Sequence, residues 1–272
     1  MTGRGMLFFE NKVVVITGAG SGIGRALALE LARRGARLAL SDISSNGLAG
    51  TVAQLPTGTH VCSYVLDVSS RSEVFRHADE VVKHFGDVHF VINNAGTSVL
   101  ATIEHSTLEE FERVLAINLW GVIHGTKAFL PKMLARHEGC IVNVSSVFGL
   151  VATPCSGAYT ISKFGVRGLT ETLWQELDGT GVRAVLVHPG GINTDISKVP
   201  SAKHEGELER KLKSANVRQM TTTPEQCARE ILAGLIRGDK RLLVGNGARS
   251  LHWISRLLPN SYGMLVRRKL GV

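Results

Sequence analysis

Two side chains that can exchange a proton stand four residues apart in the segment Tyr159-Thr160-Ile161-Ser162-Lys163. Residues at this spacing share one face of an α-helix, about 40° apart around its axis. A free tyrosine has a pKa of about 10, and a neighbouring ammonium favours the phenolate and lowers that value. Tyr159 would then give and take a proton near neutral pH, as a general acid and base does. A half-buried core tyrosine beside a solvated lysine would show the same spacing, so this interpretation needs support from other residues.

Further polar side chains stand close to other predicted elements. Ser145 and Ser146 directly follow an apolar run at 140–144, and Asn118 lies within a long helical pattern at 107–135. In open α/β sheets, ligands bind outside the carboxyl ends of the strands, so hydroxyls that follow a strand are candidates for a site. One of the two serines can instead pack or form a hydrogen bond within the turn, and Asn118 alone would equally cap or kink its helix.

A glycine-rich segment near the start of the chain predicts a phosphate site. The β-branched run at 13–16 predicts a buried strand, and it leads into Thr17-Gly18-Ala19-Gly20-Ser21-Gly22-Ile23-Gly24. Glycines let the backbone turn sharply and approach a ligand, and the N–H groups at the start of the following helix can bind a phosphate. The spacing differs from G-x-G-x-x-G, and by itself a tight strand-to-helix turn would explain it equally well.

The second apolar run supplies the residue that decides between these interpretations. It ends in Asp42, which lies 18 residues after Gly24, close to the roughly 20 at which a carboxylate meets an adenosine ribose. Asp42 would accept hydrogen bonds from the ribose hydroxyls and repel a 2′-phosphate. No arginine directly follows it and Ser21 is not basic, so the segment favours NAD over NADP. A helix cap or turn acid is the alternative interpretation of Asp42.

Strand-like and helix-like runs alternate along most of the chain. We expect strands at 13–16, 36–42, 59–66, 88–92, 140–144, 182–187 and 241–244, and helices at 23–32, 44–54, 70–85, 107–135, 158–177, 196–218 and 224–237. This alternation is typical of a parallel sheet with helices on both faces. The sequence therefore predicts an α/β fold: a single Rossmann-type, doubly wound domain over residues 1–272 with a mostly parallel seven-stranded sheet.

Together, these motifs resemble the short-chain dehydrogenase/reductase family. The matching segments are Thr17–Gly24, Asn93-Asn94-Ala95-Gly96, Asn118, Asn143-Val144-Ser145-Ser146, Tyr159-x-x-x-Lys163 and Pro189-Gly190-Gly191-Ile192-Asn193-Thr194. They follow the family's order over about residues 10–195. The resemblance implies an NAD-dependent oxidoreductase that interconverts a secondary alcohol and a ketone. A hydride would move to or from the nicotinamide C4 while Tyr159 moves a proton.

The resemblance also assigns roles to individual residues. Tyr159 would be the general acid and base, with Lys163 lowering its pKa and binding the nicotinamide ribose. Ser146, 13 residues before the tyrosine, would orient the substrate oxygen, and Asn118 would hold a relay water through its main chain. The residues expected to bind the cofactor are Gly18, Gly20, Ser21, Gly22, Ile23, Gly24, Asp42, Asp67, Val68, Asn94, Ala95, Gly96, Tyr159, Lys163, Pro189, Gly190, Ile192 and Thr194. Among these, Asp67 and Val68 would flank the adenine, and Ile192 and Thr194 would contact the carboxamide.

The segments expected to border the substrate are mostly apolar. They are 147–154, after Ser146, and 97–100, after Gly96, and they favour a lipophilic or compact alcohol or ketone over a sugar. The charged stretch at about 196–220 is interpreted as a lid that closes over the substrate, with a contact for an anionic substrate group as the alternative. His188, at the end of the sixth predicted strand, is interpreted as packed or solvent-facing and not catalytic.

Charge is distributed unevenly along the chain. Residues 198–272 contain 15 Lys and Arg against 6 Asp and Glu, a net charge of +9 within a chain whose total is +8. No nucleic-acid motif accompanies this excess, so no nucleic-acid partner is expected. In the basic extension at about 248–272, Leu251, Ile254, Leu257 and Leu258 recur at helical spacing. This pattern favours a helix packed on the domain or on a neighbouring subunit over an interfacial membrane helix.

The remaining features bound the class of protein. The four cysteines are scattered without metal-like pairing, so we expect reduced thiols, no metal site and a cytoplasmic protein. The family resemblance implies a homodimer or homotetramer formed through the helices that carry Asn118 and Tyr159. A non-catalytic nucleotide-binding or regulatory protein on the same fold is the alternative function. The intact Ser146, Tyr159 and Lys163 argue against it.

Overall fold

A single parallel sheet organises the molecule, and the computed structural model describes residues 7–194, 196 and 206–270 of the chain. The strands are β1 (Val13–Thr17), β2 (Arg37–Asp42), β3 (Val61–Val65), β4 (Phe90–Asn93), β5 (Gly139–Val144), β6 (Val182–Pro189) and β7 (Arg241–Val244). Their order across the sheet is β3-β2-β1-β4-β5-β6-β7, and all six neighbouring pairs are parallel. The predicted Rossmann-type sheet is therefore confirmed. The order reverses between β1 and β4, where ligands bind in such folds.

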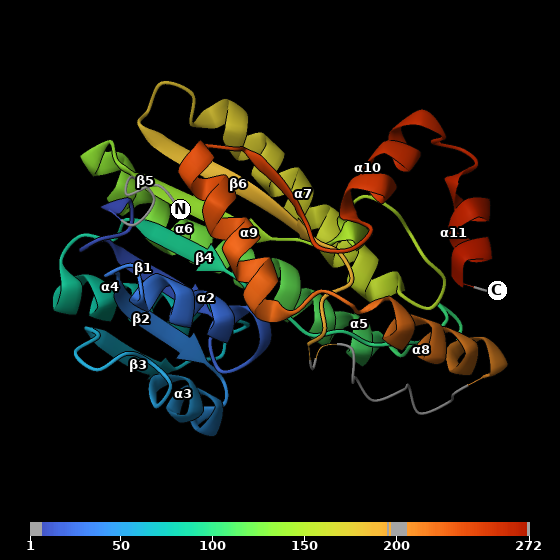
Figure 1. Cartoon of the computed structure of the whole chain (residues 1–272), viewed down its shortest axis with the longest axis horizontal. Helices are drawn as coiled ribbons and strands as arrows, with labels where there is room; N and C mark the ends of the chain where they lie inside the picture. Colours follow the sequence, from blue (N-terminus) through green and yellow to red (C-terminus); the bar gives the residue numbers. More distant parts are fainter. Residues whose placement is uncertain (1–6, 195, 197–205, 271–272) are drawn as a thin grey trace.

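Helices cover both faces of the sheet, as alternation within β1 shows. Val14 and Ile16 belong to the core beneath α2 (Gly22–Ala32) and α9 (Pro224–Arg237), whereas Val13 and Val15 point into the opposite core. The second core is closed by α4 (Arg71–Phe85), α6 (Gly121–Arg136) and α7 (Gly157–Glu176). The short helix α3 (Ser45–Val52) packs beside β2 and β3 (Figure 1). Both faces of the central strands are thus buried, which explains their unbroken apolar runs.

Local capping groups set several helix boundaries where the sequence predicts them. The Thr107 side chain accepts a hydrogen bond from the Glu110 N–H, and the Glu110 carboxylate accepts one from the Thr107 N–H, so α5 (Leu108–Leu115) begins with a capping box. Thr223 caps α9, which has Pro224 in its first turn and ends at Gly238 with φ +80°. The structure confirms the predicted bounds of α9, which these capping residues set.

The long helix expected at 107–135 is interrupted, and the expectation of one uninterrupted α-helix is wrong. Residues Ala116–Trp120 form a π-helical turn between α5 and α6. The Gly121 N–H donates to the carbonyl of Ala116, five residues back instead of four. Such turns insert one extra residue and are frequent at functional sites. Asn118, one of the predicted catalytic residues, lies within this turn.

The C-terminal part of the chain forms three helices beside the sheet. They are α8 (Glu207–Gln219), α10 (Ala248–Leu257) and α11 (Tyr262–Leu270) (Figure 1). Of the predicted lid, residues 197–205 lie outside the described residues, and α8 forms its remaining part. α10 packs against β7 and the 3-10 turn Val147–Gly149, and α11 packs against α8. Within the described ranges, no helix is long and apolar enough to cross a membrane.

Candidate active site

Ser146 and Tyr159 meet at the carboxyl end of the sheet. Ser146 follows β5 and caps the 3-10 turn Val147–Gly149, and its Oγ accepts a hydrogen bond from the Phe148 N–H over 3.1 Å. Tyr159 lies in the first turn of α7, with its phenol close enough to the Ser146 side chain for the serine to lower the pKa of the phenol. The Phe148 ring meets the Tyr159 ring edge-on, with centroids 5.9 Å apart. The structure therefore brings together the two hydroxyls expected to contact a substrate oxygen.

Lys163 lies one helical turn further along α7, and its side chain is buried. Its Nζ donates to the carbonyl of Val144 over 2.9 Å and lies 5.6 Å from the centroid of the Tyr159 ring. Burial lowers the pKa of Lys163 to about 8. It raises the pKa of Tyr159 above its usual value, and the Ser146 side chain only partly opposes this rise. The groups of the protein thus shift the Tyr159 pKa in the opposite direction to the expected one, because removing the phenolate from water outweighs the neighbouring polar groups.

Ser145, the alternative candidate for the catalytic serine, has a structural role. Its Oγ donates a hydrogen bond to the carbonyl of Lys163 over 2.8 Å, and the side chain is buried. The ideal Cβ position at Gly149 lies only 2.3 Å from this hydroxyl, so the serine is enclosed between α7 and the 3-10 turn. Ser145 therefore attaches α7 to the end of β5, and Ser146 is the serine that faces Tyr159.

Asn118 connects two parts of the site through its side chain. Its Oδ1 accepts from the Thr97 N–H over 2.8 Å, and its Nδ2 donates to the Thr97 carbonyl over 2.9 Å. The same Nδ2 lies 3.1 Å from Ser162 Oγ, which donates to the carbonyl of Tyr159 over 2.7 Å. Gly96 lies between Asn118 and Lys163, since its ideal Cβ position is 3.3 Å from Asn118 Oδ1 and 3.7 Å from Lys163 Nζ. Neither Ser162 nor this use of the amide was predictable from the sequence, because no motif marks them.

The glycine-rich turn forms a cradle that side chains would fill. Gly18 and Gly22 have φ of +67° and +50°, which glycine adopts readily. A Cβ at Gly24 would lie 2.0 Å from the carbonyl of Gly18. Ser21 makes no capping hydrogen bond to α2, so the first N–H groups of that helix point out of the turn without that partner. This shape and polarity fit the pyrophosphate of a dinucleotide.

Thr17, which was not among the predicted residues, holds the next loop against this cradle. Its buried Oγ1 accepts from the N–H groups of Asn94 and Ala95 over 3.0 and 3.1 Å. Asn94 Nδ2 in turn donates to the carbonyls of Thr17 and Gly18 over 2.9 and 3.2 Å. The loop after β4 is thereby fixed beside the glycine-rich turn. A threonine at the end of an apolar strand is the only sequence signal for this role.

Asp42 lies at the rim of the same cradle. Its Oδ2 accepts from the Gly20 N–H over 2.8 Å, and its Oδ1 accepts from the Ser44 N–H over 2.9 Å. Arg25, which the sequence analysis did not consider, also approaches this region. Its Nε donates to Thr51 Oγ1 over 2.9 Å, and its Nη2 donates to the carbonyls of Gly20 and Gly47. The carboxylate therefore faces the cradle, while main-chain oxygens hold the nearby guanidinium.

The remaining predicted residues follow the ends of β3 and β6. Asp67 Oδ1 accepts from the N–H and Oγ of Ser69 over 2.9 and 2.7 Å, and Val68 packs against Gly121. Thr194 lies beside the glycine-rich turn, since its Cγ2 is 3.2 Å from the ideal Cβ position of Gly22. Pro189 ends β6, Gly190 lies against the main chain of Asn246, and Ile192 is buried. All of these positions border the same edge of the sheet.

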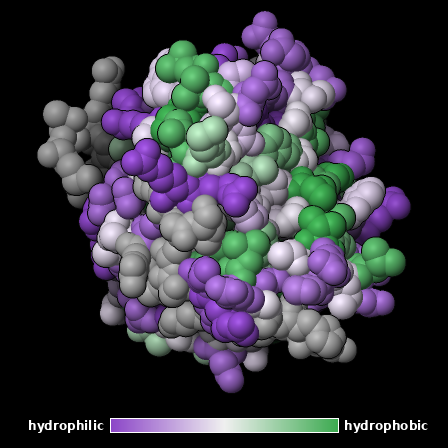
Figure 2. All heavy atoms as spheres, turned by 90° about the vertical axis from the view of Figure 1, so that its right-hand side faces the viewer, coloured by the Kyte–Doolittle hydropathy of each residue, from purple (hydrophilic) through white to green (hydrophobic). Residues whose placement is uncertain are grey.

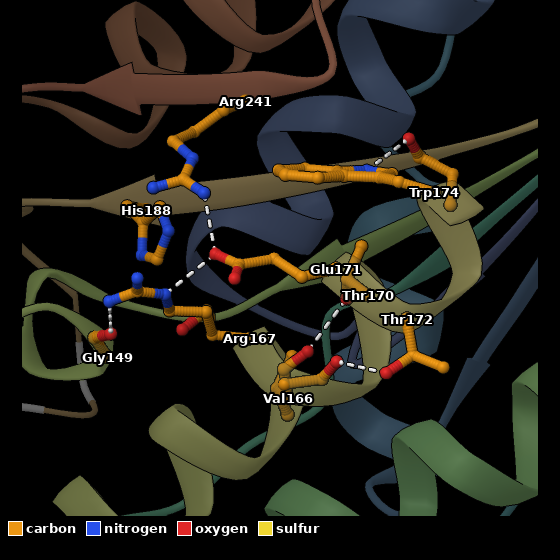
Figure 3. A network of polar contacts seen from close by, with 12 residues as sticks. Gly149, Val166, Arg167, Thr170, Glu171, Thr172, Trp174, His188 and Arg241 are labelled. Carbon is orange, nitrogen blue, oxygen red and sulfur yellow. Dashed lines mark hydrogen bonds and ion pairs between the residues drawn. The ribbon is translucent and has the colours of Figure 1, made fainter.

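A network of charges that the sequence analysis missed supports the turn after Ser146 (Figure 3). Glu171 Oε1 accepts from Arg167 Nε over 2.7 Å and from Arg241 Nη2 over 2.5 Å. Burial alone would raise the pKa of Glu171, but these two arginines lower it below its usual value. Arg167 also reaches the Gly149 carbonyl at 3.4 Å. Arg241 lies over Trp174, whose Nε1 donates to the Ala184 carbonyl, so the network joins α7 to β6 and β7.

His188, drawn beside this network in Figure 3, is buried and not solvent-facing. Its Nδ1 donates to the main-chain oxygen of Ser146 over 2.7 Å, because a carbonyl can only accept. Burial lowers the pKa of His188 to about 4, so the ring is neutral at pH 7. The histidine thus contacts the main chain of the serine predicted to be catalytic, and a lone histidine at a strand end carries no sequence signal for that contact.

The described part of the chain shows no candidate metal site and no disulfide-bonded cysteines. No group of three or more His, Cys, Asp or Glu side chains there is placed to hold a metal ion. The four cysteines are not paired in disulfides. Burial raises the pKa of Cys140 and Cys155 to about 11 and that of Cys227 to about 12, so these three groups are thiols at neutral pH.

Known proteins are similar to this chain in both sequence and fold. The sequence profile described as "short chain dehydrogenase" matches residues 12–205. A Mycobacterium tuberculosis protein named SadH is 44% identical over 264 residues, which cover 96% of each chain. Human estradiol 17-beta-dehydrogenase 11 is 32% identical over 265 residues, which cover 96% of this chain and 84% of the human protein. A short-chain dehydrogenase/reductase from Burkholderia phymatum, solved in complex with NAD, has a TM-score of 0.86 and 31% identity, covering 92% of this chain and 94% of that chain.

These similarities extend over nearly the whole chain, and the profile match at residues 12–205 spans all of the motifs described above. The chain belongs to the short-chain dehydrogenase family, and it is therefore an oxidoreductase of the class that uses a nicotinamide cofactor and a small-molecule substrate.

Proposed function

We propose that the protein is an NAD(H)-dependent dehydrogenase that interconverts a lipophilic secondary alcohol and its ketone. The observation that carries this proposal is that Ser146, Tyr159 and Lys163 lie together at the carboxyl end of the sheet, with Lys163 Nζ 5.6 Å from the centroid of the Tyr159 ring. The glycine cradle lies on the same edge. Two hydroxyls that meet beside a dinucleotide site form the arrangement needed to move a proton on a substrate oxygen.

Each residue of this group has a distinct role in the proposed reaction. Ser146 donates a hydrogen bond that orients the substrate oxygen, and Tyr159 accepts the alcohol proton during oxidation or returns it during reduction. Lys163 holds a positive charge near the phenol and offers N–H donors to a ribose hydroxyl. Asn118 positions the loop at Thr97 and the main chain of Tyr159 through its side chain. Bound NAD would supply the hydride acceptor, and its positive ring would oppose the rise in the Tyr159 pKa caused by burial.

The preference for NAD over NADP rests on Asp42. Its carboxylate lies at the rim of the cradle, where a ribose 2′-phosphate would meet a negative charge. Arg25 is the basic side chain that approaches this rim, and its guanidinium is engaged by the carbonyls of Gly20 and Gly47. We expect ribose hydroxyls to bind here more tightly than a phosphate does.

The lipophilic substrate class has two supports. The Phe148 ring borders Tyr159, and a relative acts on estradiol according to its name. Much of the expected apolar lining is instead part of the core, because Val99, Val147 and Val151 are buried. Phe148 is thus the apolar side chain of this segment that lies next to the reacting groups.

A subunit interface through the helices near the site is also proposed. Trp120 is 54% exposed at the end of the π-helical turn, and Ile161 and Phe164 are exposed on α7. Large apolar side chains exposed on two adjacent helices favour association. A homodimer or homotetramer in the cytoplasm would cover them, and sedimentation velocity of the wild type against Trp120→Ser would show whether the assembly depends on this face.

Cofactor binding is the experiment that tests the function. NADH and NADPH are titrated separately against the intrinsic tryptophan fluorescence, and secondary alcohols are then screened with NAD, with Tyr159→Phe as the inactive control. We expect tighter binding of NADH and turnover that Tyr159→Phe abolishes. Preference for NADPH would contradict the role of Asp42. Binding of NADH without any turnover would favour the regulatory alternative, and binding of neither would exclude the dehydrogenase.

A further inference from the structure

The outer side of α10 combines apolar and cationic side chains. Trp253 and Leu257 are 60% and 73% exposed, and Arg249 and Arg256 are exposed beside them. At 100° per residue these four side chains fall within about 100° of the helix circumference. The buried Ala248 and His252 lie next to this sector, on the side of Arg256, and pack toward the domain. The sequence predicts that this helix packs on the domain, and in the structure only one of its sides does so.

α11 continues the same surface. Met264 is 74% exposed and Leu265 is partly exposed, and the exposed Arg267 and Arg268 follow them. The buried Val266 holds the other side of this helix against the molecule. Figure 2 looks onto this end of the molecule, where hydrophobic patches alternate with hydrophilic ones. We call the outer sides of α10 and α11 the C-terminal face.

The charge on this face has one sign. Residues 248–272 contain five Arg and Lys and no Asp or Glu. The neighbouring helix α8 carries two acidic side chains that have other partners, since Glu207 pairs with Lys211 at 2.7 Å and Glu209 with His105 at 2.9 Å. A partner that complements this face must therefore have a negatively charged surface. That surface must also accept apolar side chains, because the tryptophan and leucine of the face are exposed.

We propose that the C-terminal face docks on an anionic lipid bilayer. Arginines interleaved with tryptophan, leucine and methionine on one side of a helix match the interface between lipid headgroups and acyl chains. A second copy of the chain fits less well, because a symmetric contact brings the same cationic patch together with itself. Nucleic acid would satisfy the charge but would leave the apolar side chains without a partner.

The face is connected to the segment that follows Ser146. α10 packs against the 3-10 turn Val147–Gly149, and the Tyr262 hydroxyl accepts a hydrogen bond from the Ala152 N–H over 3.2 Å. A docked protein would thus hold its substrate-side segment at the bilayer surface. That consequence rests on the proposed function, whereas the docking itself does not require turnover.

Vesicle co-sedimentation of the full chain tests the docking. Vesicles of phosphatidylcholine are compared with vesicles that also contain about 30% phosphatidylglycerol, at low and high salt. We expect binding only to the anionic vesicles. Each basic residue near such a surface contributes about 1 kcal/mol, or roughly fivefold, so Arg249→Glu/Arg256→Glu should weaken binding at least about 25-fold. Trp253→Ser/Leu257→Ser should weaken it further at high salt, where the apolar contribution remains.

Matched controls separate docking from net charge and from misfolding. Arg76→Glu/Lys83→Glu changes the charge equally on exposed positions of α4, and Val65→Ser removes an exposed apolar side chain from β3. These controls should bind as the wild type does, and far-UV circular dichroism should be the same for all variants. Equal binding of Arg249→Glu/Arg256→Glu and wild type, or no binding by the wild type, would overturn the proposal. So would a smaller lipid-free assembly of Trp253→Ser/Leu257→Ser, which would identify the face as a subunit contact.

Discussion

The imidazole of His188 lies 2.7 Å from the main-chain oxygen of Ser146, joining β6 to the first residue of the turn beside Tyr159. His188 is buried, and its Nε2 has no hydrogen-bond partner among the described residues. The ring thus gives one hydrogen bond to the site and no other. We therefore expect His188 to position Ser146 through the main chain of the serine.

Replacing His188 should therefore impair turnover more than binding. His188→Leu removes one of the two hydrogen bonds to this carbonyl, which still accepts from the Gly149 N–H. This loss costs about 0.5–1.5 kcal/mol of unfolding free energy, and we expect a fall of about tenfold in kcat with the Kd for NADH unchanged. His188→Asn places an amide N–H close to the position of the imidazole Nδ1 and should restore most of the rate. Steady-state kinetics and cofactor titration of both variants check this. Equal loss in the two variants would indicate a packing role alone.

Stability should depend on pH through two buried histidines. Burial lowers the pKa of His77 and of His188 from 6.5 to about 4, so protonation favours the unfolded chain. Their contribution is complete above about pH 6.5 and is lost as the pH falls toward 4, by up to about 3 kcal/mol for each histidine. His77→Phe should reduce this dependence and raise stability at pH 5, since neither nitrogen of His77 has a hydrogen-bond partner among the described residues. Urea unfolding at pH 5 and pH 8 measures both effects, and an unchanged pH dependence would contradict the assignment.

The pH profile of alcohol oxidation should report the effect of Ser146 on the pKa of Tyr159. Burial raises the pKa of Tyr159 and Ser146 lowers it, so the rate should increase with pH on the alkaline side as the phenol loses its proton. Ser146→Ala removes the lowering contribution and should move this rise to higher pH, besides reducing kcat. The measurement is kcat/KM from pH 6 to about pH 10 with NAD saturating. A rise at the same pH in both proteins would show that another group controls it.

The link between α8 and the loop before α5 should depend on Glu209. Burial would raise the pKa of this carboxyl, but hydrogen bonds from His105 and the Thr102 N–H outweigh it and lower the pKa to about 2. The link is therefore complete above about pH 4.5 and weakens as the pH falls toward 2. Glu209→Gln should increase trypsin cleavage within α8 about tenfold at pH 8. Glu207→Gln is the matched control, because it alters an exposed acid in the same turn, and equal cleavage of the two variants would contradict the prediction.

Much of the fold was predictable because its signals are local. α9 begins and ends at the predicted residues, since Thr223, Pro224 and Gly238 are each the usual residue type at such a boundary. The strands of the sheet are recognisable because both of their faces are buried and their apolar runs are unbroken. The π-helical turn Ala116–Trp120 was not predictable, because neither its composition nor its periodicity differs from that of an α-helix.

The residues of the candidate site were predictable only where they belong to a motif. The six motifs led to the cradle and to the Ser146–Tyr159 pair, and the structure brings these together. The supporting residues Thr17, Ser162 and His188 act through contacts with residues distant in sequence or with main-chain atoms, and a single sequence does not show such contacts. Burial raises the pKa of Tyr159, and this contribution was not predictable because residue spacing does not give burial.

The paired contacts with Thr97 require the two ends of the Asn118 side-chain amide to differ. One end must accept from an N–H and the other must donate to a carbonyl, at 2.8 and 2.9 Å. An aspartate has the same size and shape but offers two oxygens, so one of them would face the Thr97 carbonyl and repel it. Hydrolysis of this single amide, a change of one mass unit with no loss of volume, would therefore separate the π-helical turn from the loop that it holds.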